Sequence, residues 1–169
     1  SFKYKNLRFS FTFDGQYGGI VYSQSYHKLM EQGKLRDSLP GREDGFIVGD
    51  GVVLNQDGTY SANTKQVDLA TYYGDYYRRA NVESNSFEAS YVKLREVSFT
   101  YDFPKKLIDK TGLSNLSLTA FGRDLFIISD FPLYDPETAA LNGNTYVPGV
   151  EMGQMPSTAT YGITLKASF

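Results

Sequence analysis

The stretch Leu7-Arg8-Phe9-Ser10-Phe11-Thr12-Phe13-Asp14 alternates an apolar with a polar residue at every position. Successive side chains of a β-strand point to opposite faces of its sheet, so this alternation predicts a strand with one apolar and one polar face. The same period of two returns in later parts of the chain. We expect strands near 4–14, 18–25, 87–103, 114–124 and 159–169. The chain is therefore predicted to be an all-β, antiparallel protein.

The third of these segments contains a break in its pattern. Val92 and Leu94 set one apolar parity, whereas Val97 and Phe99 set the opposite one. The break predicts a β-bulge near Arg95-Glu96, or a change of environment along the strand.

The composition excludes several classes of protein. The 169 residues carry a net charge of −2, with no Cys and one His. A chain without a basic run does not resemble a nucleic-acid binder held by phosphate contacts. The absence of Cys removes disulfides and thiolate ligands, and one His leaves little room for a Ser-His-Asp triad. We expect no cofactor, no metal and no enzymatic activity.

Short and long connections alternate between the expected strands. Two long regions, near 26–86 and 125–158, separate pairs of strands that short linkers join. Long strands with two different faces, joined by short turns at one end and long loops at the other, are typical of an outer-membrane β-barrel. Five strands cannot close a barrel, which needs at least about eight. We therefore expect a segment of a larger barrel.

Within the long regions, three short elements are predicted. Residues 26–31 favour a helix that Gly33 ends, and Val52–Tyr60 favours a hairpin around Asn55-Gln56-Asp57-Gly58. Asp68 is a candidate N-cap for a helix over 68–73. His27 is expected to be an ordinary loop residue.

Three aromatic residues end apolar stripes. If the first, third and fifth strands run toward the short-turn side, Phe13, Phe103 and Phe169 lie at one depth, as an interfacial aromatic girdle would.

Several short runs resemble the C-terminal part of TonB-dependent outer-membrane receptors of the SusC/RagA family of Bacteroidota. The run Ala89–Pro104 resembles that family's strand and periplasmic turn, and Gly122-Arg123-Asp124-Leu125-Phe126 resembles its G-x-N-L-F segment, with Asp124 where Asn is commoner. Tyr134-Asp135-Pro136-Glu137 resembles its F-D-P-E loop. The ending from Gly153-Gln154-Met155-Pro156 to Phe169 resembles its last strand.

Three further stretches fit the same family: Phe2–Asn6, Gly18-Gly19 and Arg42-Glu43. The resemblance therefore extends over essentially the whole chain. It implies that residues 1–169 form about five C-terminal strands of a 22-stranded barrel and that the plug domain lies outside this sequence. It also implies a SusD-like surface lipoprotein as lid, TonB as energy-coupling partner, outer-membrane lipid around the barrel, and import of oligosaccharides or peptides. The terminal Phe169 resembles the signal that the barrel-assembly machinery recognises.

Candidate functional residues fall into two groups. Polar residues on the strands are expected to face the lumen: Arg8, Asp14, Arg123 and Lys166. A tyrosine-rich run in the first long region offers an apolar ring with a polar tip, suited to substrate or a partner surface: Tyr72, Tyr73, Tyr76, Tyr77 and Arg78. Alternatively, these rings pack the core of their own loop or lie at the outer membrane interface.

Other interpretations stay open at this point. The nearest carboxylate pairs, Glu43 with Asp44 and Asp135 with Glu137, are expected to be solvated loop acids, because sequence neighbours do not span a sugar as glycosidase carboxyls do. A soluble β-sandwich that binds glycans for a surface nutrient-uptake system also explains the alternation. A fragment of a secreted β-rich hydrolase is a third possibility.

Overall fold

The computed structural model describes all 169 residues, which form two compact units. The first unit comprises residues 1–19, 88–137 and 155–169, and the second comprises residues 20–87 and 138–154. None of the helices combines the length and the apolar content needed to cross a membrane.

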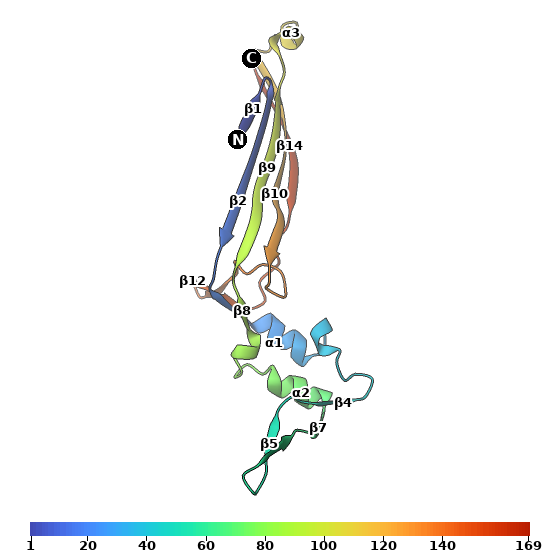
Figure 1. Cartoon of the computed structure of the whole chain (residues 1–169). Helices are drawn as coiled ribbons and strands as arrows, with labels where there is room; N and C mark the ends of the chain where they lie inside the picture. Colours follow the sequence, from blue (N-terminus) through green and yellow to red (C-terminus); the bar gives the residue numbers. More distant parts are fainter. The chain divides into compact units, whose positions relative to one another are not determined.

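The first unit is one antiparallel sheet, with the strand order β1-β2-β9-β10-β14 (Figure 1). The strands are β1 (Phe2–Tyr4), β2 (Leu7–Gln16), β9 (Tyr91–Asp102), β10 (Asn115–Ser129) and β14 (Thr160–Ser168). The predicted all-β class is confirmed. β10 continues five residues beyond the predicted end at 124.

Short and long connections alternate, but the first short connection lies before β2 and not after it as predicted. Residues 5–6 join β1 to β2, and residues 103–114 join β9 to β10 through the single-turn helix α3 (Lys105–Ile108). The long connections, 17–90 and 130–159, leave the opposite end of the sheet. We call the two ends the short-turn end and the long-loop end.

The two faces of the sheet differ in chemistry. Phe9, Phe99, Ala120 and Ile163 lie opposite one another across four strands and form part of an apolar face. On the other face, the Thr100 and Thr119 hydroxyls are hydrogen-bonded at 2.9 Å. The first unit contains no second sheet, and Phe9, Phe99 and Ile163 are 39%, 48% and 77% exposed. The β-sandwich alternative, which needs these residues in a dry core, is therefore wrong.

The break in the third segment is a β-bulge, as predicted. Glu96 pairs with Thr12 and Leu94 pairs with Phe13, so Arg95 has no partner on β2. The extra residue reverses the side-chain parity of β9. Leu94 therefore shares the apolar face with Phe99, even though the two residues are five positions apart.

The second predicted strand, 18–25, is not part of this sheet. Only Ile20–Ser23 is extended (β3), because Ser23 begins helix α1 (Gln24–Glu31) by accepting a hydrogen bond from the Tyr26 amide. Without that strand, β2 runs toward the long-loop end. Phe13 pairs with Leu94 there, whereas Phe103 and Phe169 lie at the short-turn end. The predicted common depth of the three rings is therefore wrong for Phe13.

Most of the two long regions forms the second unit, which has more regular structure than the sequence indicated. Its elements after β3 and α1 are η1 (Arg36–Ser38), β4 (Phe46–Val48), β5 (Val52–Leu54), β6 (Tyr60–Ala62), β7 (Gln66–Asp68), α2 (Leu69–Tyr76), η2 (Glu83–Asn85), β8 (Ser86–Glu88), β11 (Ala139–Asn142), β12 (Thr145–Pro148) and β13 (Val150–Glu151). They include a small sheet of order β13-β3-β8 and three two-stranded pairs: β4 with β7, β5 with β6, and β11 with β12.

Local signals placed several of these elements correctly. β5 and β6 form the predicted hairpin, in which Leu54 pairs with Tyr60. Asp68 caps α2 by accepting a 3.1 Å hydrogen bond from the Thr71 amide. The predicted helix at 26–31 is the greater part of α1.

A buried carboxylate joins the two loop regions to each other. β13 pairs parallel with β3, which places the fully buried Glu151 beside the first turn of α1. The Glu151 carboxylate accepts hydrogen bonds from the Ser23 hydroxyl at 2.5 Å, the Ser25 hydroxyl at 2.7 Å and the Ser25 amide at 3.1 Å. A helix N-terminus favours an anion because its first amides lack partners within the helix.

The core of the second unit is aromatic. Tyr26 and Tyr73 are buried with Met30, and the Tyr26 ring lies 4.7 Å from that of Phe87, edge to face. His27 is buried as well, with Nδ1 hydrogen-bonded to the Tyr77 carbonyl. His27 is thus a core residue of α1, and its expected role as an ordinary loop residue is wrong.

Candidate functional site

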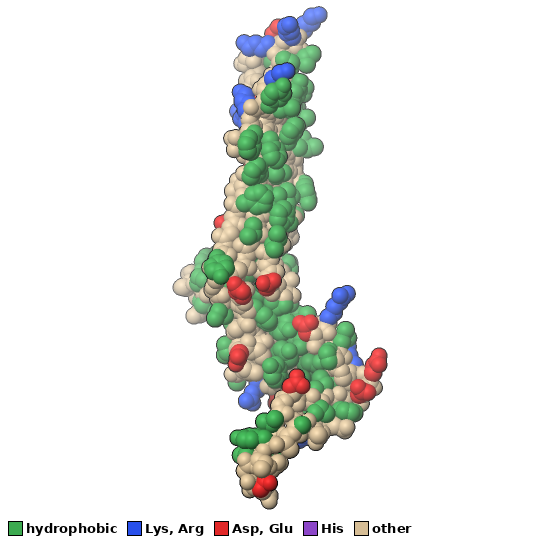
Figure 2. All heavy atoms as spheres, viewed as in Figure 1, with side chains coloured by type: hydrophobic (Ala, Val, Ile, Leu, Met, Phe, Trp, Pro, Cys, Tyr) green, Lys and Arg blue, Asp and Glu red, His purple; other side chains and the backbone are tan.

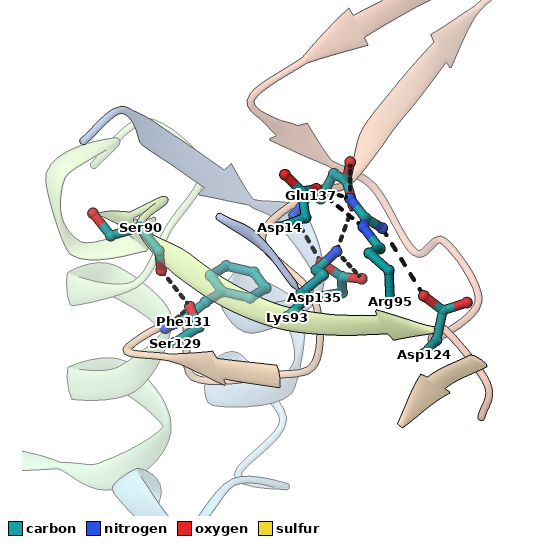
Figure 3. A network of polar contacts seen from close by, with 9 residues as sticks. All are labelled: Asp14, Ser90, Lys93, Arg95, Asp124, Ser129, Phe131, Asp135 and Glu137. Carbon is teal, nitrogen blue, oxygen red and sulfur yellow. Dashed lines mark hydrogen bonds and ion pairs between the residues drawn. The ribbon is translucent and has the colours of Figure 1, made fainter. Parts of the chain in front are cut away.

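An ion-pair network occupies the polar face of the sheet near the long-loop end (Figure 3). Lys93 Nζ lies 2.7 Å from a carboxylate oxygen of Asp135 and 2.5 Å from one of Glu137. The Arg95 guanidinium donates to Asp14 at 2.6 and 3.0 Å and to Glu137 at 2.7 Å. Two cations of β9 thus bind carboxylates of β2 and of the segment after β10.

The bulge explains how β9 supplies this network. Lys93 and Arg95 are two residues apart and share the polar face, and the extra residue keeps Glu96 on that face too. Glu96 accepts a 3.1 Å hydrogen bond from Arg123 of β10. Charged side chains therefore line the polar face through the bulge. Val92, Leu94 and Val97 of β9 stay on the apolar face.

The facing strand β10 has its own irregularity, in the run Gly122-Arg123-Asp124-Leu125-Phe126. Asp124 has a φ of +49°, a left-handed conformation that Asn, Asp and Gly tolerate better than other residues. Leu125 folds back over Gly122, where an added Cβ would lie 2.7 Å from a Leu125 methyl carbon. Gly122 and Asp124 therefore allow the irregularity of β10, which shifts its pairing with β9 between Arg123 and Phe126.

The network is strongly coupled and well paired. The Lys93 side chain is only 5% exposed, and its Nζ also lies 4.6 Å from the centre of the Tyr91 ring. Hydrogen bonds from Arg95 and then Lys93 lower the pKa of Glu137 from 4.5 to about 2. A carboxyl held ionised in this way cannot deliver a proton near neutral pH. The arrangement can fix the segment 130–137 to the sheet, and it provides no general acid.

Asp135 and Glu137 therefore differ from the prediction that they are free, solvated loop acids. Their partners Lys93 and Arg95 were not among the predicted site residues. The signal that could have found them is the phase break itself, because a bulge re-aims side chains and here brings two cations onto the polar face.

All four strand residues predicted to face a lumen lie on the polar face. Arg8 pairs with Asp102 at 3.3 Å, Asp14 with Arg95, and Arg123 with Glu96. Lys166 lies opposite Ser117 near the short-turn end. The structure brings Asp14 into the network, whereas Arg8, Arg123 and Lys166 lie at other levels of the sheet.

Some tyrosines of the tyrosine-rich run pack the core of the second unit, and others lie at its surface. Tyr73 is buried, and its hydroxyl donates to the Pro40 carbonyl at 3.1 Å. Tyr77 is half-buried against Tyr26, with ring centres 5.8 Å apart. Burial raises the pKa of both Tyr73 and Tyr77. These two rings pack the core of the second unit.

Tyr72 and Tyr76 point elsewhere. The two residues lie one helical turn apart on α2. Their rings are parallel to within 1°, and the ring centres are 5.9 Å apart. They line an open pocket of about 490 Å³ together with Asp75, Arg78 and Asn81. Flat aromatic faces beside charged and amide groups suit ligands that have both apolar and hydrogen-bonding surfaces.

Two curated proteins are similar to this chain in sequence. The chain is 32% identical over 87 residues to TonB-dependent receptor P3 of Formosa agariphila, and 26% identical over 170 residues to TonB-dependent receptor P26 of the same organism. The matches cover 49% and 98% of the chain but only 9% and 16% of those receptors. No family model matches the chain.

Solved structures point to the same fold. The structure of the RagAB peptide transporter superposes with a TM-score of 0.60 at 16% identity, over 98% of this chain and 16% of that one. The RagAB peptide importer in its open-open state gives 0.55 at 15% identity. These relatives and neighbours are receptors and transporters rather than enzymes. The chain is thus similar in sequence to part of TonB-dependent receptors, and its fold is that of part of the RagAB structures.

Proposed function

We propose that this chain forms part of the wall and mouth of a β-barrel that imports peptides or oligosaccharides across the outer membrane. The observation that carries the proposal is a single sheet with an exposed apolar face and an ion-paired polar face. In a barrel of this kind the apolar face meets lipid and the polar face lines the lumen.

The dimensions of the sheet support a membrane span. The apolar face of β9 extends from Val92 to Tyr101. Nine residue steps of about 3.3 Å, tilted by about 40°, rise about 23 Å, which matches the apolar band of about 25 Å in outer-membrane barrels.

The polar face has the properties of a lumen wall. Arg8, Asp14 and Arg123 form cross-strand ion pairs there. We assign these residues and Lys166 to the lumen. The network of Lys93 and Arg95 then fixes residues 130–137 at the extracellular mouth and shapes the entrance, with no catalytic role.

The second unit supplies the extracellular surface in this proposal. Tyr72, Tyr76 and Arg78 line its open pocket and are the residues we assign to substrate or lid contact. The partners we propose are a SusD-like surface lipoprotein on the loop side and TonB as the source of energy. Phe169, 95% exposed at the short-turn end, is the residue we assign to recognition by the assembly machinery.

Growth of the producing bacterium tests import. A strain lacking the receptor gene is supplied with casein peptides or with a defined oligosaccharide mixture as sole source, with and without a plasmid copy of the gene. We expect the gene to be needed for growth on one of the two sources. Equal growth of both strains on every source contradicts the proposal.

A matched pair of variants tests the pocket. Replacing Tyr72 and Tyr76 with Ala removes both pocket rings, and we expect slower uptake of the source that requires the receptor. The control replaces Tyr60 and Tyr146, exposed tyrosines of the same unit outside this pocket. If both double variants slow uptake equally, the assignment of the pocket is wrong.

A further inference from the structure

Basic side chains gather at the short-turn end of the sheet (Figure 2). Three belong to the linker between β9 and β10: Lys105, Lys106 and Lys110. Lys5 lies in the turn between β1 and β2. All four are exposed, and the linker contains a single acidic residue, Asp109. We call these four lysines the basic rim.

The linker that carries the basic rim is ordered. The Ile108 side chain is only 3% exposed. Backbone hydrogen bonds run from Asp109 to Lys105 at 2.9 Å and from Thr111 to Ile108 at 2.8 Å, and Ser114 donates to Ser168 of β14 at 2.8 Å. The lysines are therefore presented at a fixed level, at the point where the strands end.

Exposed apolar side chains lie at the same end. Tyr4 is 70% exposed, Leu107 64% and Phe169 95%. The Lys5 ammonium lies 5.4 Å from the Tyr4 ring centre. An apolar side chain next to a long cationic one is the combination found where a protein passes from the hydrocarbon of a bilayer to its headgroups.

We propose that the basic rim binds the headgroups of anionic phospholipids in the leaflet on the short-turn side of the membrane. The apolar face of the sheet ends at this linker, so the four ammonium groups lie at headgroup level once that face is in lipid. Each cation near an anionic surface adds attraction, and short turns of such barrels face the periplasm. The inference rests on the proposed membrane span and is independent of the cargo.

Lipid binding to the full-length receptor in detergent tests the basic rim. The delipidated protein is titrated with dioleoylphosphatidylglycerol or with dioleoylphosphatidylcholine, and bound lipid is counted by native mass spectrometry. We expect the receptor to prefer phosphatidylglycerol. In the variant K105Q/K106Q/K110Q the apparent Kd for phosphatidylglycerol rises at least about tenfold, because three attractive charges are lost.

The control variant K34Q/R36Q/K65Q removes the same charge from exposed positions of the second unit and should bind as the wild type does. Heat-dependent migration on gels checks that both variants are folded. A wild type without lipid preference, or a triple linker variant that binds as tightly as the wild type, overturns the proposal. Displacement of the lipid by millimolar inorganic phosphate overturns it as well, since the site would then bind a free anion. Failed import with intact lipid preference contradicts only the proposed function.

Discussion

At the scale of single residues, Asp124 shows why one position of a sequence motif is restricted. Its φ of +49° strains most L-residues, and only a 4.0 Å contact links its carboxylate to Arg95. We expect Asp124→Asn to leave stability unchanged and Asp124→Val to lower it by about 1–2 kcal/mol. Urea unfolding of the full-length receptor measures both. An Asn variant as unstable as the Val variant would mean that the charge matters rather than the backbone.

Glu137 gives a pH-dependent prediction. Its pKa is about 2 in the folded protein and 4.5 without its partners. A carboxyl whose folded pKa is depressed contributes stability above its unfolded pKa, and that contribution is lost as the pH falls through the folded value. We expect Glu137→Gln to lower the Tm at neutral pH, and the difference from wild type to shrink between about pH 5 and pH 2.

Exposed Glu43, for which the structure gives no ion pair, serves as the control. Glu43→Gln should leave the Tm unchanged over the same range. A constant Tm difference between wild type and Glu137→Gln down to the lowest pH would contradict the ion-pair account of Glu137.

At the scale of elements, the sheet was largely predictable because its signals are local. Alternation located β2, β9, β10 and β14, and the phase break located the bulge at Arg95. The contacts of Lys93 were not predictable in this way, since Asp135 and Glu137 lie 42 and 44 residues away along the chain. Such pairings depend on how the chain returns after β10, which no local pattern encodes.

The error at 18–25 has a similar cause. Ile20–Ser23 has strand propensity, but the Ser23 cap and the buried Glu151 convert the following residues into helix α1. Glu151 lies 128 residues from Ser23. One strand miscounted in this way reversed the inferred direction of β2 and misplaced Phe13.

The role of Glu151 can be tested directly. Glu151→Ala leaves the Ser25 amide and two hydroxyls in a buried site without their acceptor, which costs about 1–3 kcal/mol per unsatisfied group. We expect faster amide hydrogen exchange in both α1 and residues 150–154, read by mass spectrometry of the full-length receptor. If exchange rises only at 150–154, the carboxylate does not stabilise the helix.

At the scale of the whole molecule, the proposed barrel wall requires the sheet to have one face in lipid and one in water. β9 and β14 each offer adjacent residues on opposite faces: Phe99 beside Ser98, and Ile163 beside Thr164. The chain contains no Cys, so a single Cys can be placed at each position once any Cys elsewhere in the receptor has been replaced. Labels at neighbouring residues will differ in their accessibility to lipid and to water only if the two faces of the sheet meet different environments.

The most direct test is the accessibility of a nitroxide label at each of these four positions in the receptor reconstituted in vesicles. We expect labels at Phe99 and Ile163 to collide with oxygen dissolved in the bilayer, and labels at Ser98 and Thr164 to collide with a water-soluble nickel chelate. If the labels at Phe99 and Ile163 meet the chelate, or meet neither reagent, the sheet is not a membrane wall.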